Sequence, residues 1–195
     1  MHQELLNLKN QIENCTLCGL STTRTNAVFG MGNPVAEIFL IGEGPGYDED
    51  IQGLPFVGRS GQLLDKILEA CGFNRNEHVY IGNIVKCRPP ENRTPSMSER
   101  ETCLPYLYRQ IQLVDPKIII LLGATALQGL IDPFAKITKL RGTWLNWNNR
   151  IVMPTYHPSA LLRTPGLKKE AWEDFKKVVA KYRELVNPGH YSAHC

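Results

Sequence analysis

Four short apolar runs, separated by stretches of helical periodicity, constrain the fold of this 195-residue chain more than any other feature. The runs are Glu37–Gly42, Val79–Val85, Lys117–Leu122 and Arg150–Pro154. Continuous apolar runs of this length are typical of strands that are buried on both faces in a parallel sheet. The helical patterns lie at Gly58–Ala70, Ser98–Leu113, Ala124–Leu130 and Lys168–Leu185. The alternation predicts an α/β fold: a three-layer αβα sandwich with a central, mostly parallel four-stranded sheet.

Length and composition predict one domain spanning residues 1–195, with a frayed tail at Asn187–Cys195. Hydrophobic residues make up 43% and charged residues 21% of the chain, which are ordinary globular values that exclude extensive disorder. Met1–Asn14 is polar and amphipathic rather than a signal peptide, and no apolar stretch is long enough to span a membrane. We therefore expect a cytoplasmic monomer. The net charge of +3 permits an anionic partner without requiring one.

Four of the six cysteines have a spacing that predicts a metal centre: Cys15, Cys18, Cys87 and Cys103. Zinc ribbons usually repeat the compact CxxC pair, so the open spacing of the second pair and the absence of histidine favour an iron–sulfur cluster over zinc. Chance burial of small apolar side chains is the alternative. That alternative suits Cys71, which shares a predicted helix face with Leu63 and Ile67.

The segments that follow the predicted strands are the candidate binding residues, because parallel sheets bind ligands at the carboxyl ends of their strands. Gly42–Gly46 has three glycines at alternate positions, which allow the backbone to approach a ligand closely. The turn lacks both the GK[ST] and the GxGxxG pattern, so it is not a nucleotide-binding loop, and such turns are more often structural. Phe56 lies in the next loop, either as core filling or as a platform on which a base stacks.

Two further polar residues stand at strand ends. Asn83 is near the end of the second run, where it is either a turn former or an amide directed at a flat heterocycle. His157 follows the fourth run and is held extended by Pro158, although a lone histidine usually only satisfies hydrogen bonds. Each signal is weak alone.

Together, four ordered motifs give a specific resemblance. GEGPG with trailing acids, PFVG before a helix, NIVKCRPPENRTP and YHPSALLR occur in this order, threaded by the four cysteines. They resemble family 4 of the uracil-DNA glycosylases, the iron–sulfur family, over about residues 15–163 and through the last helix. The resemblance implies a DNA repair enzyme that flips uracil out of single- or double-stranded DNA. It would hydrolyse the N1–C1′ bond to give free uracil and an abasic site, without cleaving the strand.

The resemblance also implies roles for individual residues. Phe56 would stack on the flipped uracil, Asn83 would bind its Watson–Crick edge, and His157 would face uracil O2. A 4Fe-4S cluster with a structural role would be held by Cys15, Cys18, Cys87 and Cys103. The pocket would also be lined by Gly42, Glu43, Gly44, Pro45 and Glu49. The DNA contacts would come from Arg88, Arg93, Ser159, Leu161, Leu162 and Arg163, with the segment from His157 to Arg163 wedging into the duplex.

Two departures from related enzymes, at Gly44 and Asn92, bear on mechanism. Gly44 stands where the best-known uracil glycosylases carry an aspartate, so Glu43 becomes the candidate for orienting water. Glu49 is the candidate for excluding the methyl group of thymine. Asn92 occupies the place of a histidine that traps uracil covalently in a related branch, so turnover is expected here. The alternative function is a non-catalytic iron–sulfur module that binds DNA and senses a base.

Overall fold

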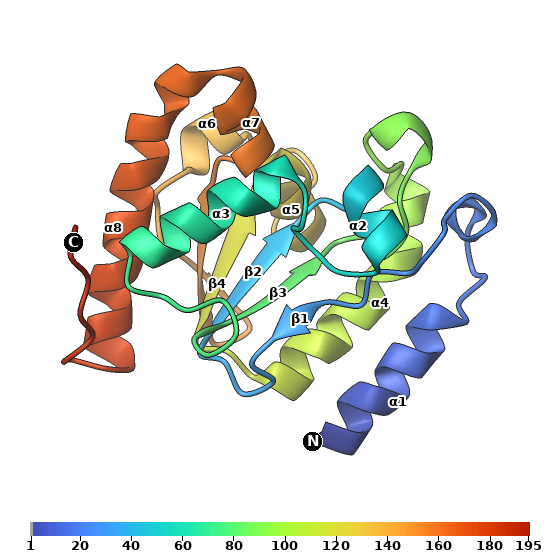
Figure 1. Cartoon of the computed structure of the whole chain (residues 1–195), viewed down its shortest axis with the longest axis horizontal. Helices are drawn as coiled ribbons and strands as arrows, with labels where there is room; N and C mark the ends of the chain where they lie inside the picture. The colour runs from blue at the N-terminus through green and yellow to red at the C-terminus, as the bar shows by residue number, and fades with distance from the viewer. Residues whose placement is uncertain (1) are drawn as a thin grey trace.

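A computed structural model describes residues 2–195, and it contains a six-stranded sheet between two layers of helices (Figure 1). The strand order is β1-β3-β2-β4-β6-β5. The central strands β3, β2, β4 and β6 are parallel, and each edge strand is antiparallel to its neighbour. The strands are β1 (Met31–Gly32), β2 (Ile38–Gly42), β3 (Val79–Asn83), β4 (Ile118–Leu122), β5 (Leu145–Trp147) and β6 (Arg150–Thr155).

The predicted parallel sheet is confirmed as the four central strands, but the predicted strand number was too low. Both missed strands are short and lie at the edges. β1 has only two residues, and β5 pairs with β6 through a tight hairpin in which Asn148 and Asn149 take positive φ values of 47° and 61°. Such strands lack the apolar run that identifies a buried strand, because both are short and their side chains are only partly covered.

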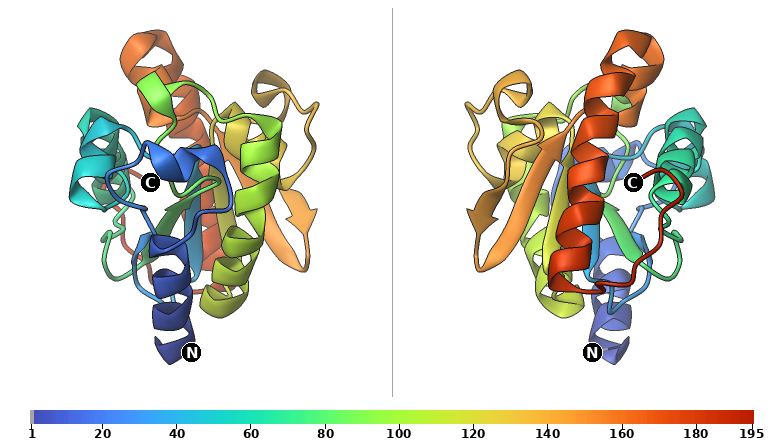
Figure 2. Two further views of the ribbon diagram at one scale, coloured as in Figure 1. Left: turned by 90° about the vertical axis from the view of Figure 1, so that its right-hand side faces the viewer. Right: turned by 90° about the vertical axis from the view of Figure 1, so that its left-hand side faces the viewer.

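The long helices cover both faces of the sheet, so the predicted sandwich is confirmed (Figure 2). On one face, α1 (His2–Glu13), α4 (Met97–Val114) and α5 (Ala124–Leu130) share a core with Phe39 and Ile41. On the other face, α3 (Arg59–Ala70) and α8 (Lys168–Leu185) pack over Ile38 and Leu40. Alternate residues of β2 thus enter opposite cores, as the period of a strand requires.

Short helices gather at the carboxyl edge of the sheet, where they shape the loops. α2 (Tyr47–Gln52) follows β2, and α7 (Pro158–Arg163) follows β6. A further short helix is α6 (Ile137–Leu140), and 3₁₀ turns are η1 (Gly19–Thr22), η2 (Pro90–Asn92) and η3 (Pro165–Leu167). Ser96 caps α4 in a reciprocal arrangement with Glu99: each side chain accepts a hydrogen bond from the backbone N–H of the other residue.

The C-terminal tail is held against the fold, in contrast to the frayed end expected from sequence. Arg183 of α8 donates to the carbonyls of His190 and Cys195 at 2.9 and 3.1 Å. The His190 ring stacks on Phe73, with 4.5 Å between centroids, and Ser192 donates to the Ala70 carbonyl at 2.9 Å. Specific hydrogen bonds therefore order a segment whose composition is typical of a loose end.

None of the helices within residues 2–195 combines the length and apolar character needed to cross a bilayer.

Candidate active site

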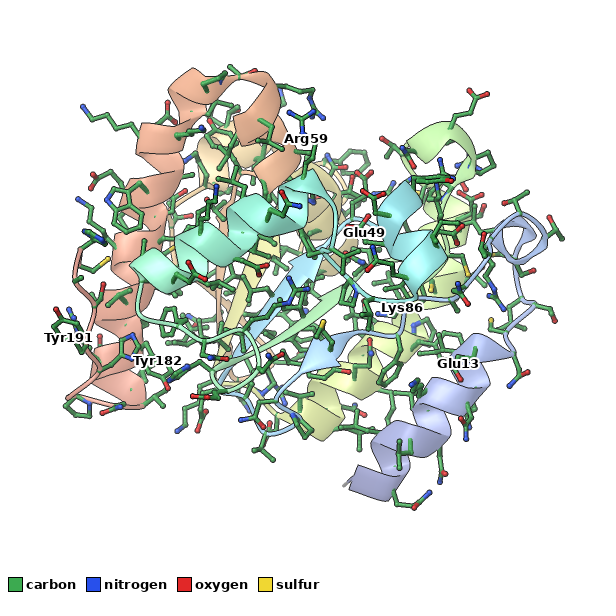
Figure 3. The ribbon with its side chains drawn as sticks, in the orientation of Figure 1. Glu13, Glu49, Arg59, Lys86, Tyr182 and Tyr191 are labelled. Atoms are coloured by element: carbon green, nitrogen blue, oxygen red, sulfur yellow. The ribbon has the colours of Figure 1, made fainter. Side chains whose placement is uncertain are left out.

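A cavity of about 630 Å³ opens at the carboxyl edge of the sheet. Its lining includes Glu49 of α2, which is labelled in Figure 3. Its walls come from the segments that follow β2, β3, β4 and β6. The fold therefore brings the predicted strand ends to one place. The residues singled out individually from the sequence that line this cavity are Glu43, Gly44, Pro45, Glu49, Phe56, Asn83, Asn92, Arg93, His157, Ser159 and Arg163. Within the described residues, the wall does not include Gly42, Arg88, Leu161 or Leu162.

Gly42 lies directly beneath the cavity and must be glycine for steric reasons. A Cβ atom at this position would lie 2.5 Å from Asn83 Oδ1 and 2.8 Å from Phe56 Cζ. Both side chains therefore pack onto the bare backbone of Gly42. Because Gly42 has no side chain, the Asn83 amide and the Phe56 ring can lie together at one end of the pocket.

Asn83 carries an unsatisfied buried acceptor. The residue is 2% exposed, and its Oδ1 atom has no hydrogen-bond partner among residues 2–195. A buried amide oxygen without a partner costs free energy, roughly 1–3 kcal/mol, so such atoms are rare in folded proteins. The Asn83 amide is thus poised to accept a hydrogen bond from a ligand N–H group.

His157 is the N-cap of α7, and its hydrogen bonds define its tautomer. Its Nδ1 atom accepts from the Ser159 backbone N–H at 3.1 Å and lies 2.8 Å from Ser159 Oγ. Desolvation, reinforced by the positive charge of Arg163, lowers the pKa of His157 from 6.5 to about 4. The ring is therefore neutral near pH 7 with its proton on Nε2, because Nδ1 acts as the acceptor. The His157 ring centroid lies 5.5 Å from that of Phe56.

Glu43 has a partner that the sequence did not indicate. The Thr125 hydroxyl, at the start of α5, donates to Glu43 Oε2 across the cavity. Thr125 follows β4 and also lines the pocket. The sequence signal for this residue is weak: Thr125 stands two positions after Gly123, which follows the buried strand β4, and threonine is common near helix starts. The hydrogen bond fixes the orientation of the Glu43 carboxylate.

Glu49 binds backbone on both of its oxygens. Oε1 accepts from the N–H groups of Val57 and Gly58 at 2.9 and 2.8 Å, and Oε2 accepts from the Gly46 N–H at 3.1 Å. The Gly46 amide is therefore already bonded within the protein and is not free to donate to a ligand. Glu49 thereby joins the turn after β2 to the loop that carries Phe56.

The predicted DNA-contacting residues differ in exposure. Leu161 is buried at 2% exposure, Leu162 is half-buried and Arg163 is exposed. Arg93 forms a two-pronged ion pair with Glu99, at 2.7 and 2.8 Å. The Arg88 guanidinium lies over the exposed Tyr47 ring, 5.1 Å from its centroid. The burial of Leu161 leaves Leu162 and Arg163 as the accessible part of the α7 segment.

The four predicted metal-binding cysteines come together at a second, smaller cavity. Cys15 and Cys18 lie between α1 and η1, Cys87 follows β3, and Cys103 is on α4. All four thiols line one space of about 20 Å³. Arg24 donates to Cys87 Sγ at 2.9 Å, and the neighbouring Lys86, labelled in Figure 3, is 1% exposed.

The donor set consists of four cysteines around one space, which suits the four-thiolate ligation of an iron–sulfur cluster. Within residues 2–195, no three His, Cys, Asp or Glu side chains are grouped so that they could hold a single metal ion. Zinc requires its sulfur ligands about 2.3 Å from one centre. A 4Fe-4S cluster is larger and is held by four thiolates spread around it, with hydrogen bonds to sulfur as additional stabilisation. The single shared cavity and the Arg24–Cys87 contact agree with that arrangement.

Comparison with known proteins defines the class. Residues 29–176 match the family model described as the uracil DNA glycosylase superfamily, so the chain belongs to that superfamily. It is also similar to proteins named type-4 uracil-DNA glycosylase, as the sequence motifs predicted. The relative from Sulfurisphaera tokodaii is 45% identical over 195 residues, 95% of this chain and 86% of the relative. Those from Thermotoga maritima and Archaeoglobus fulgidus are 45% and 41% identical, over 90% of this chain in both cases and 93% and 92% of the relatives.

Proposed function

We propose that this protein removes uracil from DNA by hydrolysing the N1–C1′ bond, which releases free uracil and leaves an abasic site. Membership of the superfamily and similarity to type-4 enzymes support this activity. The structural observation that carries it is the buried, unpartnered Oδ1 of Asn83 at the end of the cavity. This oxygen can accept a hydrogen bond from the N3–H group of uracil.

Base recognition follows from the amide. Uracil presents the N3–H donor beside the O4 acceptor, and a fixed amide meets them with its oxygen and nitrogen respectively. Cytosine reverses both groups, so it would face the Asn83 oxygen with an unprotonated N3. The Phe56 ring stacks on the flipped base, while Glu49 stands at the cavity wall near that ring. We propose that this wall also excludes the methyl group of thymine.

Catalysis rests on stabilising the leaving base. Cleavage of the N1–C1′ bond leaves negative charge on uracil and positive character on the sugar. Neutral His157 donates its Nε2–H to uracil O2, where negative charge develops. One such preorganised donor contributes roughly 3 kcal/mol to transition-state stabilisation. Glu43, oriented by Thr125, positions the water that attacks C1′ and stabilises the cationic sugar.

The target base must leave the duplex before it reaches this cavity, at a cost of a few kcal/mol. Leu162 and Arg163 of α7 fill the vacated space, while Arg88, Arg93 and Ser159 contact the backbone around it. We propose that the protein acts as a cytoplasmic monomer on single- and double-stranded DNA. Light scattering on purified protein, free and bound to a uracil-containing oligonucleotide, measures its molar mass and tests whether it is a monomer.

The four cysteine thiolates hold a 4Fe-4S cluster in this proposal. When bound, the cluster supplies structural cross-links rather than chemistry on the base. Its ligands join the segment after α1, the segment after β3 and helix α4. Lys86 is next to Cys87 and donates to the Asn83 carbonyl at 2.7 Å, so the ligand loop is tied to the base-reading residue. Arg24 offsets negative charge on Cys87.

A uracil-release assay on the iron-loaded protein tests the function. We expect free uracil and an abasic site that breaks only after alkali treatment. Asn83→Asp is the matched variant: it replaces the amide nitrogen, a donor toward O4, with an acceptor, so uracil release should fall sharply. Binding of uracil-containing DNA without release of uracil would favour the alternative, a non-catalytic DNA-binding module. The presence of Glu43, Asn83 and His157 in one cavity argues against that alternative.

A further inference from the structure

Phe56 has an unusual backbone conformation for an aromatic residue. Its φ angle is +53°, in the left-handed region that non-glycine residues rarely adopt. Its side chain is nevertheless only 5% exposed, with the ring end against Gly42. Residues persist in this region only where the surrounding structure holds them, and such positions cluster at ligand-binding sites. The surrounding residues must therefore hold Phe56, whose ring is proposed to stack on the base, in this conformation.

Arg75 provides that support from outside the pocket. It lies in the loop between α3 and β3, and its guanidinium donates to the carbonyls of both Pro55 and Phe56, the latter at 2.8 Å. The side chain is 15% exposed and also pairs with Asp65 of α3 at 2.8 Å. The planar fork of arginine can bind two adjacent carbonyls at once, which a lysine ammonium cannot do in the same geometry.

Glu49 and Gly61 also contribute to holding this loop in place. Glu49 accepts the N–H groups of Val57 and Gly58, so a carboxylate holds the loop on one side of Phe56 and a guanidinium holds it on the other. A Cβ atom at Gly61 would lie 1.9 Å from the Phe56 carbonyl oxygen, so α3 can approach only because residue 61 is glycine. The carbonyl groups of Pro55 and Phe56 and the N–H group of Val57 therefore all have hydrogen-bond partners.

We propose that Arg75 is a positioning residue for uracil excision, which acts through Phe56. Its guanidinium holds Phe56 in the left-handed conformation that directs the ring into the pocket. This inference rests on the proposed function. Arg75 does not line the cavity, so its influence on the base is indirect.

A double-mutant cycle tests the inference. Arg75→Met keeps the length of the side chain and removes its donors. We expect it to reduce the single-turnover rate of uracil release about tenfold, equally on single- and double-stranded substrate, because base seating rather than flipping is affected. In a Phe56→Ala background the same substitution should change the rate less than about twofold, because the group through which Arg75 acts has been removed.

Controls separate positioning from a general loss of structure. Asp65→Asn removes the acidic partner of Arg75 but leaves both carbonyl contacts, so the parental rate is expected. Iron content and thermal midpoint identify variants that are misfolded. If Arg75→Met does not fold, Arg75→Lys in both backgrounds replaces it, with a smaller loss expected only where Phe56 is present.

Two results would overturn the proposal for Arg75. One is a parental rate for the folded Arg75→Met protein. The other is an equal fold-loss with and without the Phe56 ring. If the parental protein itself releases no uracil, the proposed function fails instead, which keeps the two failures distinct.

Discussion

Thr125 and Glu43 are joined by a hydrogen bond across the cavity, although they are 82 positions apart in the chain. The hydroxyl comes from the segment after β4 and the carboxylate from the turn after β2, which are adjacent parallel strands. Their register therefore places the two residues side by side at the same edge. A carboxylate held in this way has one preferred orientation toward the cavity.

We expect Thr125→Val to slow single-turnover uracil release about tenfold, because a hydrogen bond to a charged group contributes roughly 1.5 kcal/mol. Thr125→Ser keeps the hydroxyl and should stay within about twofold of the parent. Quenched-flow measurement with saturating protein isolates the chemical step. A parental rate for Thr125→Val would mean that the orientation of Glu43 is immaterial.

The pH dependence should reflect the environment of His157. Its pKa is lowered from 6.5 to about 4, so the ring remains neutral until the pH falls toward that value. We expect the single-turnover rate to be constant between about pH 5 and 8 and to decline only below this range, as Nδ1 becomes protonated and its hydrogen bond from the Ser159 N–H is lost. An inflection near pH 6.5, as for an ordinary histidine, would contradict the buried neutral state.

Leu161 and Leu162 should behave differently despite being neighbours. Leu162 is half-buried and can reach DNA, so Leu162→Ala should slow excision from duplex DNA several-fold while sparing single-stranded substrate, which needs no unstacking. Leu161 is 2% exposed, so Leu161→Ala should instead lower the thermal midpoint, in line with a cost of roughly 2–5 kcal/mol for truncating a core leucine. Equal effects of Leu162→Ala on both substrates would remove Leu162 from the wedge.

The cysteine site should contain iron and sulfide. Purified protein should be brown, with about four irons per chain, and Cys18→Ala should lose the colour and most of its folded yield, because a structural metal contributes folding free energy. Cys71→Ala is the matched control: it is also a cysteine substitution but lies in the opposite core, so iron content should be unchanged. Stoichiometric zinc without iron in protein prepared anaerobically would contradict the cluster.

The central fold was predictable because strands buried on both faces have a continuous apolar sequence. The four central strands and the four predicted helices, α3, α4, α5 and α8, lie within a few residues of their predicted bounds, whereas α1 was not among the predicted helices. The edge strands were missed, since β1 and β5 are short and only partly covered. The ordered tail was also missed, because the hydrogen bonds of Arg183 to His190 and Cys195 are tertiary contacts that leave no local pattern.

The site was predictable where its residues directly follow strands, and less so elsewhere. Asn83 and His157 were identified because the carboxyl ends of parallel strands meet at one edge. Arg75 was missed because it precedes a strand and reaches the Phe56 loop only through the tertiary fold. The burial of Leu161 was hidden as well, because a six-residue helix does not reveal from sequence which face will pack inward.

The position of the cysteines along the chain has a consequence for biosynthesis. Cys103 is the last of the four, whereas β4, β6 and His157 all follow it in sequence. Every thiol of the set is therefore synthesised before β4, β6 and the histidine of the pocket, when only two of the four parallel strands have been made. For the proposed cluster, iron and sulfide could therefore bind to the nascent chain from that stage on. Closure of the long loop between Cys18 and Cys87 at this point would reduce the conformational search for the strands that are synthesised afterwards.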